Sequence, residues 1–211
     1  MIETLLAAAA IQAAGPSFDC RRASSDAERA ICTDPELARL DRELALHYVG
    51  ARRLLARTPR AALEADQRRF LAARDEAYEM RGRLPEFADL AGRMRDRSEF
   101  LSALSRRAPQ GLVGTWAKES GRVEITQAGA GRVRVRINTA HPTNARWVCD
   151  VETTGRVASR AVEGPAEGET GRRIRATLRN GVLHIEEIGQ GAPGYCGANG
   201  SVAGAYLPVA G

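Results

Sequence analysis

The chain has 211 residues, of which 44% are hydrophobic and 27% charged. This balance is typical of a soluble globular protein and excludes a disordered one, and the length holds one large or two small domains. The formal net charge is +5, but the basic residues are spread out and form no tail or long run. We therefore do not expect a nucleic-acid-binding protein.

The first residues have the pattern of a secretory signal peptide. Residues 5–15 form a short apolar core that ends in the small residues Ala13, Ala14 and Gly15, and this stretch is too short to span a bilayer. Met1-Ile2-Glu3 lacks the usual positive charge, so either the start lies further upstream or the signal is a poor one. We expect residues 1–15 to be removed and the mature protein to be periplasmic or secreted.

Cysteine usage agrees with export. Four cysteines are divided evenly between the two halves, as in proteins of an oxidising compartment. A disulfide between Cys20 and Cys32 would tie the N-terminal arm to the helix that follows, and one between Cys149 and Cys196 would close a loop in the second half. Four cysteines allow three connectivities, of which pairing within each half is the simplest. Two buried, reduced thiols are the alternative at Cys20 and Cys32.

Two capping patterns predict how the first helices begin. Ser25 and Glu28 have the spacing of a capping box, which predicts a short helix over residues 26–31. Thr33 and Glu36 repeat that spacing, and Pro35 suits the first turn of a second helix. We therefore expect a new helix to start directly after Cys32.

Apolar residues at three- and four-residue spacing continue this helix to about residue 56. The next helix should start at Thr58-Pro59 and stop at Gly82, and its short connection predicts an antiparallel pair. A third helix should start at Leu84-Pro85 and end before Pro109. The sequence thus predicts an up-and-down helical domain over residues 16–108. It should have three main helices and one short helix that the Cys20–Cys32 disulfide holds in place.

Several motifs of this half occur in a distinctive order. They are Ser17-Phe18-Asp19-Cys20, Ala30-Ile31-Cys32-Thr33-Asp34-Pro35-Glu36-Leu37-Ala38, Leu40-Asp41-Arg42-Glu43-Leu44 and Gln67-Arg68-Arg69-Phe70-Leu71-Ala72-Ala73-Arg74-Asp75. Residues 17–107 resemble the N-terminal domain of the LprI lysozyme-inhibitor family. The resemblance implies a secreted, non-enzymatic helical domain. Members commonly carry a second cysteine pair after the Arg-Asp motif, whereas residues 76–83 contain none.

Beyond Pro109 the hydrophobic period changes to two. Alternation is clearest in Val133-Arg134-Val135-Arg136-Ile137, and Asn180-Gly181 is a strong hairpin signal. Residues 163–171 are expected to form a polar, glycine-rich loop. Roughly six or seven antiparallel strands should form a meander or small barrel over residues 109–211, which makes the fold class α+β. Trp147-Val148-Cys149 and Tyr195-Cys196-Gly197 loosely resemble the small antiparallel barrels of MliC-type periplasmic lysozyme inhibitors.

Chemistry typical of enzymes is not indicated. His47, His141 and His184 each lack a second ligand at metal-binding spacing, so no metal site is predicted. Residues 189–194 match a dinucleotide-binding glycine motif, but no helix can follow it, so no cofactor is predicted either. No nucleophile with an orienting base appears, and we expect a binding protein rather than an enzyme.

The resemblance implies a muramidase as the partner. One candidate contact is the loop of residues 118–122, which would place Lys118 against the catalytic carboxylates of a muramidase, although a short hairpin turn with an exposed lysine is the simpler explanation. Arg68, Arg74 and Asp75 lie in the family-like motif and are further candidates, with a solvated helix face or an internal ion pair as the alternative. Two other functions stay open: a β domain that binds a small ligand or cell-wall fragment, and a structural envelope component.

Overall fold

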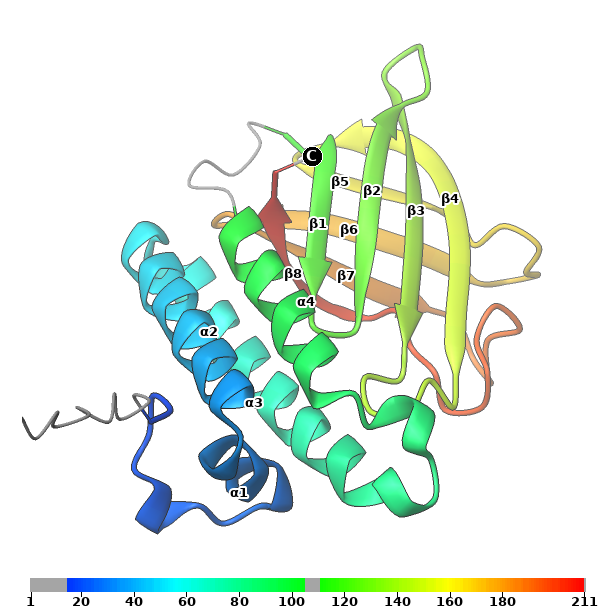
Figure 1. Cartoon of the computed structure of the whole chain (residues 1–211). Helices are drawn as coiled ribbons and strands as arrows, with labels where there is room; N and C mark the ends of the chain where they lie inside the picture. The colour runs from blue at the N-terminus through cyan, green and yellow to red at the C-terminus, as the bar shows by residue number, and fades with distance from the viewer. Residues whose placement is uncertain (1–14, 105–110, 211) are drawn as a thin grey trace, which may run out of the picture.

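The computed structural model describes residues 15–104 and 111–210, so the predicted signal peptide and the predicted boundary near Pro109 fall almost wholly outside the described residues. A layer of helices lies against one side of a closed antiparallel β-barrel (Figure 1). This arrangement confirms the α+β prediction. No helix among the described residues is long and apolar enough to cross a membrane.

Residues 15–104 hold four α-helices and three short 3₁₀ turns. The α-helices are α1 (Asp26–Thr33), α2 (Pro35–Leu54), α3 (Arg57–Glu79) and α4 (Leu90–Ala103), and the 3₁₀ turns are η1 (Cys20–Arg22), η2 (Met80–Gly82) and η3 (Pro85–Phe87). The three main helices and the short stapled one are thus present as predicted.

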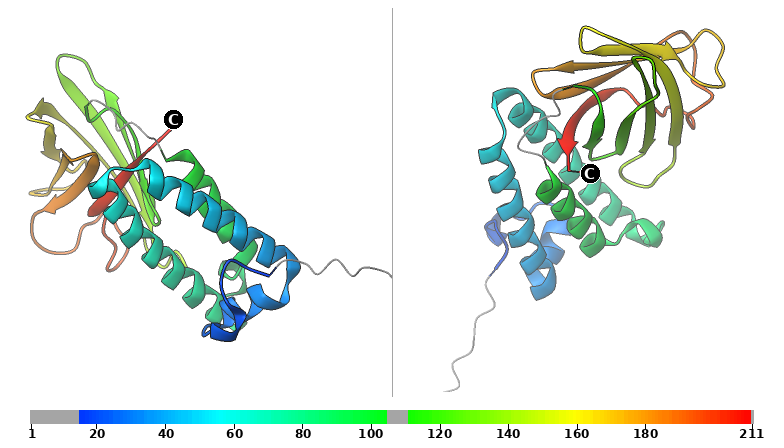
Figure 2. Two further views of the ribbon diagram at one scale, coloured as in Figure 1. Left: turned by 90° about the vertical axis from the view of Figure 1, so that its left-hand side faces the viewer. Right: turned by 90° about the horizontal axis from the view of Figure 1, so that it is seen from above.

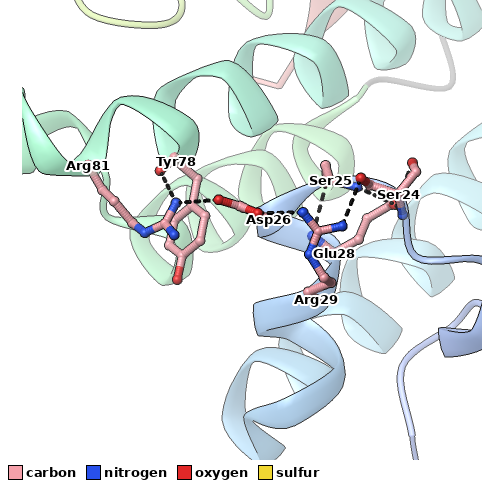
Figure 3. A network of polar contacts seen from close by, with 7 residues as sticks. All are labelled: Ser24, Ser25, Asp26, Glu28, Arg29, Tyr78 and Arg81. Atoms are coloured by element: carbon pink, nitrogen blue, oxygen red, sulfur yellow. Dashed lines mark hydrogen bonds and ion pairs between the residues drawn. The ribbon is translucent and has the colours of Figure 1, made fainter.

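The capping box at the start of α1 is confirmed, and it lies beside a contact that fixes α1 on α3. The Glu28 amide donates to Ser25 Oγ at 3.1 Å, and the Glu28 carboxylate accepts in return from the Ser25 amide (Figure 3). Next to the box, Asp26 accepts from Arg81 Nη1 at 3.0 Å. The Arg81 guanidinium also lies 4.6 Å from the centre of the Tyr78 ring. The start of α1 is therefore tied to the turn η2, which directly follows α3.

Three predicted helix starts were wrong. Asp34, not Thr33, caps α2 by accepting from the amides of Glu36 and Leu37, because Thr33 is the last residue of α1. Helix α3 begins at Arg57 without a side-chain cap, one residue before the predicted cap at Thr58. The Leu84-Pro85 start gives only the turn η3, after which Asp89 caps α4.

The helices pack in a way that the sequence did not specify. Helices α2 and α3 run antiparallel, but α2 packs mainly on α4, while α3 also faces the barrel (Figure 2). The apolar core of the helical part includes Ile31, Leu63 and Met94 and continues into Val182 and Leu207 of the barrel. The helices therefore share an apolar core with β7 and β8, while the inside of the barrel forms a second, separate core.

Eight strands follow one another around the barrel, and β1 closes it by pairing with β8. The strands are β1 (Gly114–Lys118), β2 (Gly121–Gln127), β3 (Arg132–Ala140), β4 (Val148–Ala158), β5 (Ala161–Pro165), β6 (Arg173–Arg179), β7 (Val182–Ile188) and β8 (Gly204–Val209).

Strand β5 was missed, and the loop predicted over residues 163–171 begins only after it. Its short sequence contains glycine and proline, which are weak strand signals. The structure explains the glycine. A Cβ atom on Gly164 would lie 2.4 Å from Thr153 Oγ1, and one on Gly155 would lie 2.5 Å from the Glu163 carbonyl oxygen. Glycine thus permits the close approach of β4 and β5 at this corner.

The inside of the barrel is filled with side chains. Trp116 and Tyr206 are fully buried there, and their polar atoms are satisfied: Trp116 Nε1 donates to the Leu112 carbonyl at 3.0 Å, and Tyr206 Oη donates to the Val202 carbonyl at 2.7 Å. The structure therefore gives no support to a ligand held inside the barrel.

Both predicted disulfides are present. Cys20–Cys32 joins η1 to α1, and Cys149–Cys196 joins β4 to the loop between β7 and β8.

Removing these bridges should cost unequal amounts of stability. Replacing Cys149 and Cys196 with serine is expected to lower the free energy of unfolding by about 4 kcal/mol, because this bridge joins residues 47 apart. The same change at Cys20 and Cys32, which are 12 apart, should cost about 3 kcal/mol. Urea denaturation of both variants measures the difference, and a larger loss for the Cys20–Cys32 variant would contradict this expectation.

Candidate functional site

The seam between helices and barrel contains a group of polar side chains, several of them buried, which is here called the seam cluster. Its members are Asp66, Gln67, Arg69, Arg97, Lys118 and Glu119. Helix α3 supplies the first three, α4 supplies Arg97, and the last two lie at the end of β1 and in the turn that follows. Residues from both parts of the chain thus meet at one place.

Arg97 is the centre of this cluster. Its side chain is only 2% exposed, and Nη1 donates to Asp66 Oδ2 at 2.7 Å while Nε donates to Gln67 Oε1 at 2.9 Å. The guanidinium also lies 5.1 Å from the centre of the Phe70 ring and 4.6 Å from that of Phe100. Stacking between two rings and two charge-assisted hydrogen bonds hold this cation in one orientation.

The Glu119 side chain lies beside this pair and is 6% exposed. Its backbone amide donates to Asp66 Oδ1 at 3.0 Å, and its Oε1 accepts from Arg69 Nε at 3.1 Å. Burial, together with the nearby Asp66 carboxylate, raises the pKa of Glu119 to about 7. Burial alone would also raise the pKa of Asp66, but its hydrogen bonds to Glu119 and the charge of Arg97 hold it below the usual value.

Two buried polar atoms of the cluster lack a hydrogen-bond partner among the described residues: Arg97 Nη2 and Glu119 Oε2. Such atoms are uncommon in native proteins because each one carries a desolvation cost. Both residues line a half-open cavity of about 160 Å³. The remaining walls are Phe70, Ala73, Arg93, Asp96, Phe100, Lys118 and Pro142.

Lys118 does not project from an exposed loop, as one interpretation of the sequence expected. Its Nζ donates to the Ala203 carbonyl at 2.8 Å and lies 4.7 Å from the centre of the Tyr206 ring. Burial lowers the pKa of this amine. The turn after Lys118 packs on α3 through Glu119, so it is not free to enter the cleft of a partner.

The other predicted site residues are separated. Arg74 is buried and pairs with Asp75 at 2.6 Å, which matches the internal ion pair that was the alternative for this motif. Both line a groove of about 310 Å³ between the N-terminal arm, α1, α2 and α3. Arg68, also on α3, is exposed to solvent. Of these three residues, Arg68 is thus the most exposed.

One contact was not foreseen from the sequence. His47 Nδ1 lies 2.6 Å from Ser98 Oγ, which joins α2 to α4. Their separation of 51 positions leaves no local signal for this pair. Within residues 15–104 and 111–210, the hydrogen bond of the His47 ring is the one to Ser98. No group of three or more metal-binding side chains occurs in the described part of the chain.

A second exposed feature is the hairpin between β2 and β3, whose tip is formed by residues 128–131. Figure 1 shows this hairpin reaching beyond the neighbouring strands. Gly129, Ala130 and Gly131 all have positive φ angles, of 76°, 49° and 71°. At its base Arg132 and Arg156 are directly opposite each other on β3 and β4, and both are exposed.

The raised pKa of Glu119 predicts a pH effect on stability. The folded protein holds this proton up to about pH 7, whereas an unperturbed glutamate carboxyl, whose pKa is 4.5, loses it earlier. Between these values the folded state binds more protons, so its stability falls as the pH rises. From pH 5 to pH 8 the wild type should lose about 2 kcal/mol relative to Glu119→Gln. Urea denaturation at both pH values measures this, and equal pH dependence in the two proteins would contradict it.

Comparison with known proteins relates the helical part to a protein family. No curated protein and no solved structure matches the chain. Residues 20–110 match the family model described as Lysozyme inhibitor LprI. The matched region covers the Cys20–Cys32 disulfide, the helices α1 to α4 and the Arg74-Asp75 motif. The helical part of this chain is therefore similar to the lysozyme inhibitor LprI family, as its cysteine pair and its Gln67-to-Asp75 motif predicted.

Proposed function

We propose that this protein is a non-enzymatic inhibitor of a muramidase in the periplasm or outside the cell. The observation that carries this proposal is the match of residues 20–110 to the lysozyme inhibitor LprI family. The two disulfides support an oxidising compartment, where such a target is met. The proposed partner contact is stoichiometric and needs no cofactor.

The contact surface proposed here differs from the Lys118 loop because that loop is packed against α3. The β2–β3 hairpin is a better candidate, since its tip consists of alanine and glycine and reaches beyond the barrel (Figure 1). Small side chains allow a backbone turn to enter a narrow cleft. Arg156 Nη1 donates to the Ala130 carbonyl at 3.3 Å, which links the tip to β4.

The charges at the base of this hairpin favour a carboxylate partner. Arg132 and Arg156 form a cross-strand pair of like charge, which is unfavourable by itself. Neither forms an ion pair within the described residues, whereas Arg134 and Arg136 further along β3 both pair with Glu152. Glycoside hydrolases carry two catalytic carboxyl groups in their cleft, and guanidinium groups bind carboxylates well.

Net charge does not assist this association at long range. A protein with a formal charge of +5 gains no steering toward a basic lysozyme. Recognition would therefore depend on local contact between the hairpin and an acidic cleft, with exposed Arg68 of α3 as a further proposed contact.

The test is a cell-wall lysis assay with c-type, g-type and bacterial muramidases, with and without the purified, oxidised protein. We expect saturable inhibition of one class at equimolar protein. The double variant Arg132→Ala/Arg156→Ala should inhibit at least tenfold more weakly, because it removes the two guanidinium groups that are proposed to bind the target's carboxylates.

The matched control is Arg173→Ala/Arg175→Ala, which removes two barrel arginines that already pair with Glu163 at 2.5 and 2.6 Å. This control should inhibit as well as the wild type. Equal weakening in both double variants would reject the hairpin as the contact. A protein that leaves all three enzyme classes unaffected at high molar excess would reject the inhibitor itself and favour a structural envelope component.

A further inference from the structure

The cavity of the seam cluster has features of a binding site that the inhibitor proposal does not use. It lies between α3, α4 and the end of β1, and its lining comes from both the helical part and the barrel. Its two unpartnered polar atoms, Arg97 Nη2 and Glu119 Oε2, belong to side chains that are more than nine-tenths buried. Both atoms were removed from water on folding without gaining a partner, which is unfavourable unless another molecule supplies one.

The position of Arg97 makes it a fixed donor rather than a mobile cation. Asp66 and Gln67 occupy Nη1 and Nε, and the rings of Phe70 and Phe100 flank the guanidinium. These contacts leave Nη2 as the guanidinium nitrogen without a hydrogen-bond partner among the described residues. A guanidinium held in this way loses little conformational freedom when it binds an acceptor.

The walls of the cavity indicate the kind of molecule that fits. Phe70, Ala73, Phe100 and Pro142 give it apolar surface, so a ligand with a small apolar body is favoured over a bare inorganic ion. The charged groups that face this region are Asp66 and Arg69 of α3, Arg93, Asp96 and Arg97 of α4, and Lys118 and Glu119 at the end of β1. Cations outnumber anions among them, which favours an acidic ligand.

We propose that this cavity binds a small carboxylate with a short apolar body, with one oxygen accepting from Arg97 Nη2 and the other lying against the Glu119 carboxyl group. An ionised Glu119 would instead repel the ligand. The pKa of Glu119, raised to about 7 by burial and by Asp66, keeps this carboxyl protonated in mildly acidic solution. Binding should therefore weaken as the pH rises above 7.

Propionate is a suitable probe, and the measurement is a titration of the isotopically labelled full chain followed by NMR amide shifts at constant ionic strength. At pH 5.5 we expect saturable shifts at Phe100 and Glu119. At pH 8 only about one tenth of Glu119 would be protonated for a pKa near 7, so the apparent dissociation constant should rise about tenfold.

Glu119→Gln is the decisive variant, because its amide keeps both an acceptor for Arg69 and an N–H donor toward the cavity. It should bind propionate with the same affinity at pH 5.5 and pH 8. Glu124→Gln, which changes an exposed barrel carboxylate outside this cavity, should keep the tenfold pH effect of the wild type.

Two neutral or inorganic probes define the ligand class. Propionamide and phosphate should each bind at least tenfold more weakly than propionate at pH 5.5. Binding of either with equal affinity would overturn the carboxylate assignment. The absence of saturable shifts with propionate at pH 5.5, or the same pH dependence in wild type and Glu119→Gln, would overturn the site itself. These outcomes are independent of the lysis assay, which tests the hairpin.

Discussion

Burying the guanidinium of Arg97 carries a desolvation cost that the Asp66 carboxylate and the Gln67 amide must offset. Removing one partner of such a pair leaves an uncompensated buried charge, which is strongly destabilising. The positions of α3 and α4 are therefore linked to each other. Because Asp66 also accepts from the Glu119 amide, the same interaction fixes the β1–β2 turn of the barrel on the helices.

The seam between helices and barrel is used for packing, and other surfaces of the molecule stay exposed. The buried cluster and the shared apolar core hold the helices on β7 and β8, so surfaces that face away from the seam stay available. The β2–β3 hairpin is one of these surfaces. In the part of the chain that the structure describes, its Arg132 and Arg156 form no ion pair, whereas Arg134 and Arg136 of β3 pair with Glu152. A proposed contact with a large partner and a proposed small-ligand cavity thus occupy different places and can be changed independently.

Local signals in the sequence predicted much of the fold but misplaced several boundaries. The capping box of Ser25, the hydrophobic period and the Asn180-Gly181 turn depend on residues close in sequence, and all three correspond to elements of the structure. The start of α2 was displaced because Asp34, next to Thr33, is an equally good cap and Thr33 remained helical. Strand β5 was missed because its pairing with β4 and β6 depends on neighbours in space.

The sequence by itself determined the class of fold, the disulfide corner and the family-like motif, since each depends on short spacings and residue types. Only the tertiary structure decided what the charged residues do. Arg74 and Lys118 look like surface cations in the sequence, yet packing buries the first and half-buries the second. The Arg97 site joins α3, α4 and β1, and its hydrogen-bond partners Gln67 and Asp66 are 30 and 31 positions away. Contacts of that range follow from how elements pack, and no local pattern encodes them.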